Sequence, residues 1–552
     1  MIQQEYEKLR SRYRETDRDC ADLFYRLNCR GSYERDPFVP DIAEKAAHEQ
    51  RLSRLREQVA ALPTPEPQFD LVKGHFQDFL DSVDWKLASL YENPSESLEP
   101  FFWMYSRIDR DCRCQEEKDR LLVDLYGQMP AVWGGIRSWY RSAKPARLRG
   151  AIAALRDAQA GMARTTFYSP ELKTTMDLAG KRMGEYAAEL ARLLTDGGED
   201  SAPLSDSRRT IQMPREAYRA LLRDLRGVNL DELLSWGEAE MEKTRANCFK
   251  IAARLADDKG EPRPETMAQV NDLLFKYAGP CGSPEEMFAR AAGYLKRTRA
   301  LAHEYVRLPE DECCQLVEIP WKLRESFPWG GFSSGDAKRR PITGQMFLNQ
   351  YNYTAATDGW LKMDCLHEAY PGHHVQFVRT ITDPIPETMK IGAKSIPLME
   401  GMCHRTEHAF EFIYGEDPFY PLFVAYRRHH TAVRIQADLM LYYYGRPIEE
   451  AVRLYERELG FDRRSARGQV QAHEDRPGYF TCYYYGMKKL CDWEVQYGFE
   501  KKAYTELLFS LSNVSLETFE KLLKLTPQQR ERFFHDFASL YMDLDERFPG
   551  LE

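Results

Sequence analysis

The stretch DCLHEAYPGHHVQ, residues 364–376, decides how this chain is interpreted. His367 and the glutamate after it begin like the zinc-protease signature HExxH, in which a second histidine follows four residues after the first. Here the fourth residue after His367 is Pro371, and the next histidines are His373 and His374. On a straight helix, a side chain six residues on points about 120° away, and one seven residues on lies about 10.5 Å along the axis. A regular helix would therefore bring neither histidine to His367.

The proline and glycine between the two halves of the motif predict a bulge or a break. Pro371 removes the helical hydrogen bond to the His367 carbonyl and clashes with that carbonyl. Gly372 permits backbone angles that other residues avoid. We expect this distortion to bring one late histidine back toward His367. His373 is the favoured second metal ligand, and His374 is the alternative, otherwise expected beside the ligands or facing the substrate.

Histidines are concentrated around this motif. Eight of the twelve lie within about a fifth of the chain, where an even distribution would place two or three. A histidine cluster beside glutamates indicates metal or proton chemistry. Its members are His367, His373, His374, His404, His408, His429, His430 and His473.

A third metal ligand is expected in IPLMEGMCHRTEHAFE, residues 396–411, because a zinc site of this kind needs three protein ligands and one open position. Glu400 and His404 share a helix face, and Glu407 adds a second carboxylate on it. Glu400 is the favoured ligand because apolar residues surround it in the sequence, and a buried carboxylate is costly unless it binds metal or is paired. The alternative is that these are solvated charges of an ordinary helix.

Glu368, next to the first ligand, is the expected general base. Zinc lowers the pKa of a bound water toward ~7, so that a well-placed carboxylate can activate this water for attack on a carbonyl. The motif thus predicts one zinc ion per chain, held by His367, His373 and Glu400.

Four blocks of this sequence resemble a known family. HEAYPGHHVQ resembles the HEGIPGHHLQ signature of the bacterial domain-of-unknown-function family 885. MEGMCHRTE, VRIQADLMLYYYGRPIEEAV and RPGYFTCYYYG resemble three further blocks of that family in the same order, so that the likeness covers roughly residues 364–490. It aligns Glu400 and Glu407 with the two glutamates of the family, and Arg434, Asp438 and Tyr483 with its arginine, aspartate and tyrosine.

The resemblance implies a fold and an activity. The fold is mainly α, a gluzincin-like helical metallopeptidase fold with a deep channel and a small β-sheet beside the active-site helix. The family is thought to be related to carboxypeptidase Taq-type and thimet-oligopeptidase-like zinc metallopeptidases. The implied function is zinc-dependent hydrolysis of peptide bonds in short peptides, with carboxypeptidase action favoured.

The resemblance also suggests roles for later residues. The hydroxyl of Tyr483, or of the two tyrosines that follow it, could stabilise the oxyanion formed at the carbonyl, and His473 is a weaker candidate for the same role. Arg434 could form a helix salt bridge with Asp438, or it could hold a substrate carboxylate. Three departures from the family pattern leave substrate preference open: His404 for an apolar residue, Tyr442 for a common histidine, and Tyr479 for glutamine.

Helical signals dominate the chain. In residues 43–62, apolar residues repeat at helical spacing up to Pro63. A cap followed by proline predicts helix starts at Ser169, Ser283 and Thr526, the last two with a capping box. Strands are predicted in 314–321 and 344–353, with a glycine-rich turn in 327–336 between them. The linker-like stretch 195–207 suggests an N-terminal helical lobe, residues 1–200, and a catalytic region, residues 201–552, within one integrated fold.

Composition narrows the cellular setting and the partners. The 43% hydrophobic and 12% aromatic content excludes a mostly disordered chain, and a net charge of −9 without a large basic patch argues against nucleic acid. The charged N-terminus has no signal-peptide core, and no apolar run approaches the ~18 residues of a membrane span. The twelve cysteines form no CxxC pair. We expect a cytoplasmic protein with a short peptide as partner; the oligomeric state is left open.

Two other classes compete with the enzyme. A non-catalytic helical binding scaffold could keep the fold without hydrolysis, but such a protein would not need Glu368. A di-iron carboxylate bundle would carry paired Glu-x-x-His motifs. Asp364-x-x-His367 is the nearest approach, and no second motif matches it.

Overall fold

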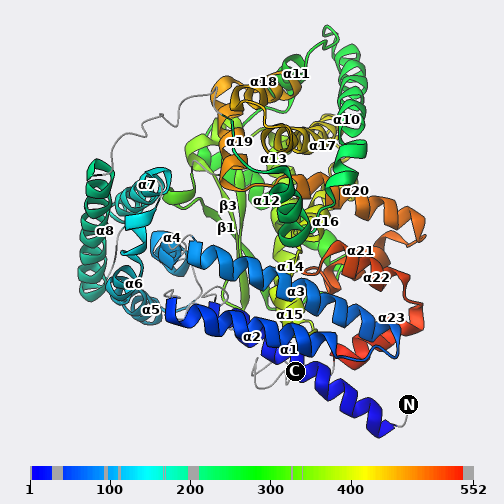
Figure 1. Cartoon of the computed structure of the whole chain (residues 1–552). Coiled ribbons are helices and arrows are strands. Elements are labelled where there is room, and N and C mark those ends of the chain that lie inside the picture. Colours follow the sequence, from blue (N-terminus) through cyan, green and yellow to red (C-terminus); the bar gives the residue numbers. More distant parts are fainter. Residues whose placement is uncertain are drawn as a thin grey trace.

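The structure is a computed structural model that describes residues 3–27, 42–92, 97–109, 113–143, 145–165, 167, 169–196, 210–324, 327–337 and 340–538. Helices make up most of it, around one three-stranded sheet, which confirms the predicted mainly α fold with a small sheet (Figure 1). The helices of the first part are α1 (Gln3–Leu27), α2 (Ile42–Ala60), α3 (Pro67–Glu92), α4 (Glu99–Asp109), α5 (Gln115–Gly127), α6 (Met129–Ile136), α7 (Pro145–Met162) and α8 (Pro170–Asp196).

The later helices enclose the histidine segment. They are α9 (Arg215–Ala220), α10 (Leu230–Lys259), α11 (Met267–Tyr277), α12 (Pro284–Tyr305), α13 (Asp358–Asp364), α14 (His373–Thr382), α15 (Glu387–Ile391), α16 (Ile396–Ala409), α17 (Tyr420–Asp438), α18 (Ile448–Leu459), α19 (Arg463–Asp475), α20 (Thr481–Gln496), α21 (Lys501–Ser510), α22 (Leu516–Lys524) and α23 (Pro527–Phe533).

The predicted helix starts agree with the structure. Helices α8, α12 and α23 each begin at the proline that follows the predicted cap, and the capping box at Thr526 is complete. The box at Ser283 is only half formed: the serine hydroxyl accepts from the Glu286 backbone, but the Glu286 carboxylate accepts from Gly282 instead of Ser283. The helix end is still satisfied, because both groups take up free backbone N–H donors.

The sheet consists of β1 (Glu312–Glu318), β2 (Gly330–Ser333) and β3 (Ile342–Leu348) in the order β1-β3-β2. Strand β1 pairs parallel with β3, and β2 pairs antiparallel with it. Both predicted strands are present, but β2 lies where a turn was predicted. The glycines there serve close packing: a Cβ atom on Gly331 would lie 2.6 Å from the Phe347 ring on the neighbouring strand.

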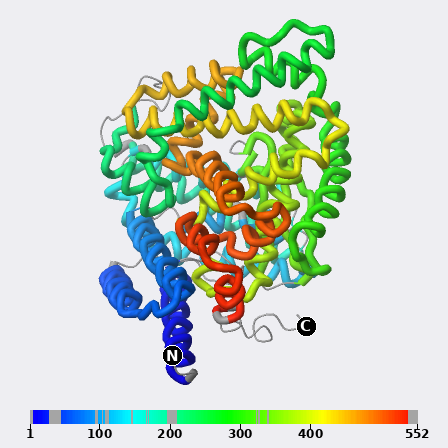
Figure 2. Tube along the Cα trace, turned by 90° about the vertical axis from the view of Figure 1, so that its right-hand side faces the viewer, coloured from blue at the N-terminus to red at the C-terminus, as the bar shows by residue number. Residues whose placement is uncertain are grey.

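Two large hydrophobic clusters, beside a small third one at Ile342, Val378 and Ile381, form the core of the described residues. Helices α4 to α8 enclose one of them, on the left of Figure 1. The larger core joins α1 to α3 with the second half of the chain, and α3 packs against α22 and α23. Figure 2 accordingly shows the blue N-terminal helices beside the red C-terminal ones. The predicted lobe boundary stays a prediction, because residues 197–207 of its linker lie outside the described residues.

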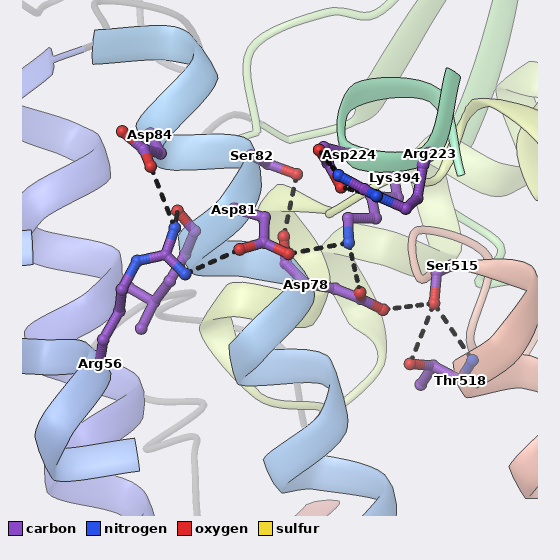
Figure 3. A network of polar contacts seen from close by, with 11 residues as sticks. Arg56, Asp78, Asp81, Ser82, Asp84, Arg223, Asp224, Lys394, Ser515 and Thr518 are labelled. Carbon is purple, nitrogen blue, oxygen red and sulfur yellow. Dashed lines mark hydrogen bonds and ion pairs between the residues drawn. The ribbon is translucent and has the colours of Figure 1, made fainter. Parts of the chain in front are cut away.

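A polar network fastens α3 to the loop that precedes α16 (Figure 3). Lys394, in the left-handed region with φ 47°, places its ammonium 2.8 Å from Asp78 and 2.9 Å from Asp81. Asp78 also accepts a hydrogen bond of 2.6 Å from Ser515, the N-cap of α22. Arg56 of α2 continues the network to Asp81. Ionic and capping contacts thus tie the entry of α16 to helices from both ends of the chain. No described helix is both long and apolar enough to cross a membrane.

Candidate metal centre

The helix is interrupted at the predicted point of the histidine motif. After α13 the helix widens into a π-helix, Cys365–Ala369, in which the Tyr370 N–H donates to the Cys365 carbonyl five residues earlier. Helix α14 then starts anew at His373. Gly372 is needed for a different reason from the expected one: its φ of −137° is open to any residue, but a Cβ atom there would lie 2.0 Å from the His367 carbonyl oxygen.

This break brings His373 to His367. The two rings lie 5.0 Å apart between centroids, edge to face. One donor atom from each of His367, Glu368 and His373 lies within 4.8 Å of the others, a grouping that could hold a metal ion. His367 is buried, whereas Glu368 and His373 are partly exposed, so the group is reachable from outside.

Glu400 of α16 completes this group. Its Oε2 atom lies 3.4 Å from Nε2 of His367 and 3.4 Å from Nε2 of His373. A charge-assisted hydrogen bond between nitrogen and carboxylate would be about 2.7–2.9 Å long, and this buried oxygen has no hydrogen-bond partner. The donor atoms of a tetrahedral zinc site lie about 3.3 Å apart. Two imidazoles and an unsatisfied carboxylate oxygen at this spacing fit a zinc ion, which leaves a fourth position for water.

Close contacts between histidines and carboxylates dominate the electrostatics of the group. Burial alone would lower the pKa of His367, but contacts with Glu400 and Glu407 outweigh it and raise that pKa to about 10. Burial would also lower the pKa of His373. The neighbouring Cys403 and Glu400 outweigh burial and raise that pKa well above its usual value. The same histidines overcome burial to hold the pKa of Glu400 well below its ordinary range. The carboxylate is therefore charged, as a metal ligand must be.

Glu407 contacts the His367 ring on the side away from Glu400. Its Oε1 lies 2.7 Å from His367 Nδ1 and its Oε2 lies 2.8 Å from His404 Nδ1. His404 in turn meets the Thr431 hydroxyl at 2.8 Å through Nε2, and Arg427 approaches Glu407 at 3.6 Å. Carboxylates behind ligating histidines fix the ring orientation and raise ligand basicity. The buried Glu407 has the geometry of such a partner.

His374 faces away from this group. It is fully buried, and its Nε2 lies 2.6 Å from Oε2 of Glu312 on β1. Glu312 also accepts from Tyr370 and pairs with Arg299, and these contacts together with His374 overcome burial and lower the pKa of Glu312 to about 2. His374 thus anchors α14 to the sheet, and a substrate could not reach it. Of the two adjacent histidines, the geometry favours His373 as the ligand.

Of the three consecutive tyrosines, only Tyr483 lies at the group. Its ring stacks on His367 at 6.3 Å, and its hydroxyl lies 3.4 Å from that of Tyr479. Tyr479 donates a 2.5 Å hydrogen bond to the other oxygen of Glu400. The hydroxyls of Tyr484 and Tyr485 instead donate to glutamates of α10. Burial raises the pKa of Tyr483, so its hydroxyl keeps the proton that it would donate.

Arg434 lies beside Tyr483, and no acidic residue in the described part of the chain pairs with it. Its guanidinium is 5.2 Å from the Tyr483 ring centre, it donates to Gln469 at 3.3 Å, and its buried Nε has no hydrogen-bond partner. Burial and the nearby Arg427 lower the pKa of Arg434. Among the described residues no ion pair joins Arg434 to Asp438, which leaves the guanidinium available to a substrate anion.

Asp438 and His473 form a separate buried network. Asp438 accepts a 2.6 Å hydrogen bond from the Tyr218 hydroxyl and lies 2.7 Å from His473 Nδ1. The other ring nitrogen of His473 meets the Tyr455 hydroxyl at 2.7 Å. With both nitrogens engaged in the core, His473 has no donor left for an oxyanion. These two residues hold α9, α17, α18 and α19 together.

Three residues of the site were not assigned a role from the sequence. Glu312 lies 62 positions before its partner His374, so nothing local indicates their contact. Tyr479 stood out only as a departure from the family pattern. Arg427 precedes Arg434 by seven residues, and this helical spacing could have indicated that both point to one side of α17.

The family of the chain can now be stated. A family model described as a bacterial protein of unknown function (DUF885) matches residues 29–497. The chain belongs to this family. The match covers the whole proposed metal centre of this DUF885 protein, together with most of its N-terminal helices. A search of curated proteins found no match.

Solved structures resemble this DUF885 protein in fold. A candidate lipoprotein from Colwellia psychrerythraea shares 14% identity at a TM-score of 0.70, covering 96% of this chain and 99% of that one. A candidate lipoprotein of unknown function from Shewanella oneidensis shares 16% at a TM-score of 0.64, covering 91% and 96%. A candidate oligoendopeptidase F from Bacillus anthracis, 12% identical over 94% and 100%, has a TM-score of 0.32, too low to indicate a common fold.

Proposed function

We propose that this chain is a zinc-dependent hydrolase of peptide bonds in short peptides. One observation carries the proposal: the buried Glu400 Oε2 has no hydrogen-bond partner and lies 3.4 Å from a ring nitrogen of each of His367 and His373. A buried carboxylate oxygen is rarely left unsatisfied unless a group absent from the chain itself binds there. Carboxylate and imidazole donors in this number are a typical zinc set.

Each residue then has a role in hydrolysis. A zinc ion held by His367, His373 and Glu400 would supply Lewis acidity to a water and to the carbonyl of the substrate. Glu368, partly exposed beside His367, would take the proton of the attacking water at its carboxylate. The Tyr483 hydroxyl would donate a hydrogen bond to the carbonyl oxygen as negative charge develops on it.

We further propose carboxypeptidase-like action. Arg434 is buried, has no acidic partner among the described residues, and stacks on the ring of Tyr483. An arginine so placed would bind the terminal carboxylate of a peptide through charge-assisted hydrogen bonds. The alternative function, a helical scaffold without hydrolysis, would leave Glu368 without a purpose.

The deciding experiment compares the full-length protein with Glu368→Gln. Zinc content is measured by elemental analysis, and hydrolysis with a library of short peptides. We expect one zinc per chain in both proteins and cleavage only by the wild type, because the amide cannot take a proton from water. Equal cleavage by both would exclude Glu368 as the base. Absence of stoichiometric zinc from wild-type protein refolded or expressed with zinc would overturn the proposal.

The location of the protein is tested separately. The expected cytoplasmic location rests on the sequence alone, and the two solved structures of similar fold are described as candidate lipoproteins. Fractionation of the native host, with detection by an antibody against the chain, would distinguish a cytoplasmic from a membrane-attached protein.

A further inference from the structure

A cavity lies between α10, α17 and α20, among the helices in the upper right of Figure 1. Its volume is about 420 Å³, within the range of small-molecule sites. Its lining combines apolar side chains such as Ala425 and Met487 with several charged side chains. None of the proposed metal ligands lines this cavity.

The charges around the cavity are unbalanced. Four cations line it against two carboxylates: Lys243, Lys250, Arg428 and Lys488 against Glu240 and Asp492. Both carboxylates are already engaged, since Glu240 lies 3.2 Å from Lys243 and Asp492 lies 2.9 Å from Lys488. Lys250 and Arg428 therefore have no acidic partner among the described residues, in a chain whose net charge is −9.

Among the cations of the cavity, Arg428 gives the strongest indication of a ligand. It comes from α17, and its Nη2 contacts the Met487 sulfur at 3.1 Å. Its Nε is buried and has no hydrogen-bond partner. Leaving a buried charged donor unsatisfied is energetically costly, so an arginine placed in this way points to an anionic group supplied from outside the chain.

The cavity lies on a different side of the two helices from the metal centre. On α17, Arg427 approaches Glu407 at 3.6 Å, whereas the next residue, Arg428, lines the cavity. On α20, the Tyr483 ring stacks on His367, whereas Tyr484 lines the cavity. Successive residues of a helix point about 100° apart, so each helix serves two sites at once.

We propose that this cavity binds a small organic dianion. Arg428 and Lys250 would each neutralise one negative charge, and the apolar part of the ligand would lie on Ala425 and Met487. A phosphate monoester and a dicarboxylate share this chemistry. The site is independent of the proposed hydrolysis and requires no metal.

The test uses three probes that share an aromatic ring: phenyl phosphate, isophthalate and neutral benzamide. Binding to the full-length chain is measured by isothermal titration calorimetry at low salt. At least one dianion binds at millimolar or lower concentration, benzamide does not, and the tighter dianion identifies the anionic group. Binding of neither dianion, or equal binding of benzamide, would overturn the proposal.

Matched variants locate the site. Arg428→Met and Lys250→Met, which keep an apolar side chain, each weaken dianion binding about tenfold, the loss of about one charge-assisted contact. Lys250 is exposed, so this variant stays folded even if Arg428→Met does not. Lys502→Met, an exposed lysine outside the cavity, leaves the affinity unchanged. If Arg434→Met weakens binding and the cavity variants do not, the dianion binds at the metal centre and the proposal is wrong.

Discussion

The Nδ1 atom of His367 lies 2.7 Å from Oε1 of Glu407, while its Nε2 faces Oε2 of Glu400 at 3.4 Å. One ring thus lies between two carboxylates at different distances. The first makes a hydrogen bond of normal length, and the second lies too far away for one. The short contact fixes the ring so that the long one remains open for a metal.

Glu407→Gln is expected to weaken zinc binding by about 10- to 100-fold, because partners behind a ligating histidine typically have effects of this size. The affinity is measured by competition with a chromophoric chelator. Glu411→Gln, four residues later and partly exposed, is the matched control and should bind zinc like the wild type. An unchanged affinity in Glu407→Gln would show that His367 does not depend on this contact.

The two adjacent histidines should respond in opposite ways to alanine. His373→Ala removes a proposed ligand from a partly exposed position, so zinc is lost while the thermal midpoint of the metal-free protein changes little. His374→Ala takes away one buried hydrogen-bond partner of Glu312, which keeps Tyr370 and Arg299, so the fold is destabilised by about 1–3 kcal/mol, but zinc still binds. Zinc content and chemical denaturation are measured on both variants. Loss of zinc only in His374→Ala would reverse the ligand assignment.

Gly372→Ala should disrupt the centre through sterics alone. The added methyl group would lie 2.0 Å from the His367 carbonyl oxygen, so the break must widen; we expect a loss of about 1–3 kcal/mol in unfolding free energy and loss of zinc. Gly293→Ala, in the exposed middle of α12 with no atom within 4 Å of the new methyl, should instead stabilise by about 0.5–1 kcal/mol. Equal effects of the two substitutions would contradict the close approach at Gly372.

A buried histidine far from the motif predicts how stability depends on pH. Burial lowers the pKa of His75 on α3 from 6.5 to about 4. The contribution of neutral His75 to the free energy of unfolding is complete above pH 6.5. It is lost as the pH falls toward 4, because the unfolded chain then binds a proton that the folded chain does not bind. The pKa change corresponds to about 3 kcal/mol. His75→Phe should therefore show a flatter loss of stability between pH 6.5 and 4 in urea unfolding; parallel curves would show that His75 titrates normally.

Local chemistry allowed the helices and the histidine break to be predicted. Proline after a cap marks the starts of α8, α12 and α23, and the proline–glycine pair marks the interruption between Ala369 and His373. These signals depend on a few neighbouring residues, so one sequence is enough. The strand β2 was missed because its glycines give the same local signal whether they turn or pack against Phe347.

Partners across the fold could not be predicted in the same way. Periodicity placed Glu400 and Glu407 on one helix face but did not show that they bind opposite sides of the same imidazole. Nor did it show that His473 belongs to a separate network with Tyr455. Such pairings depend on how helices distant in sequence pack, which a helix pattern alone leaves undetermined.

The network around Asp78 also bears on how the protein is made. The Lys394 loop, which leads into the helix of Glu400, contacts Asp78, and Asp78 in turn contacts Ser515. A ribosome delivers these residues in order, so a growing chain holds its histidines and Glu400 long before residue 515 has emerged. The contacts that join the Glu400 helix to Asp78 and Ser515 can therefore be completed only near the end of translation.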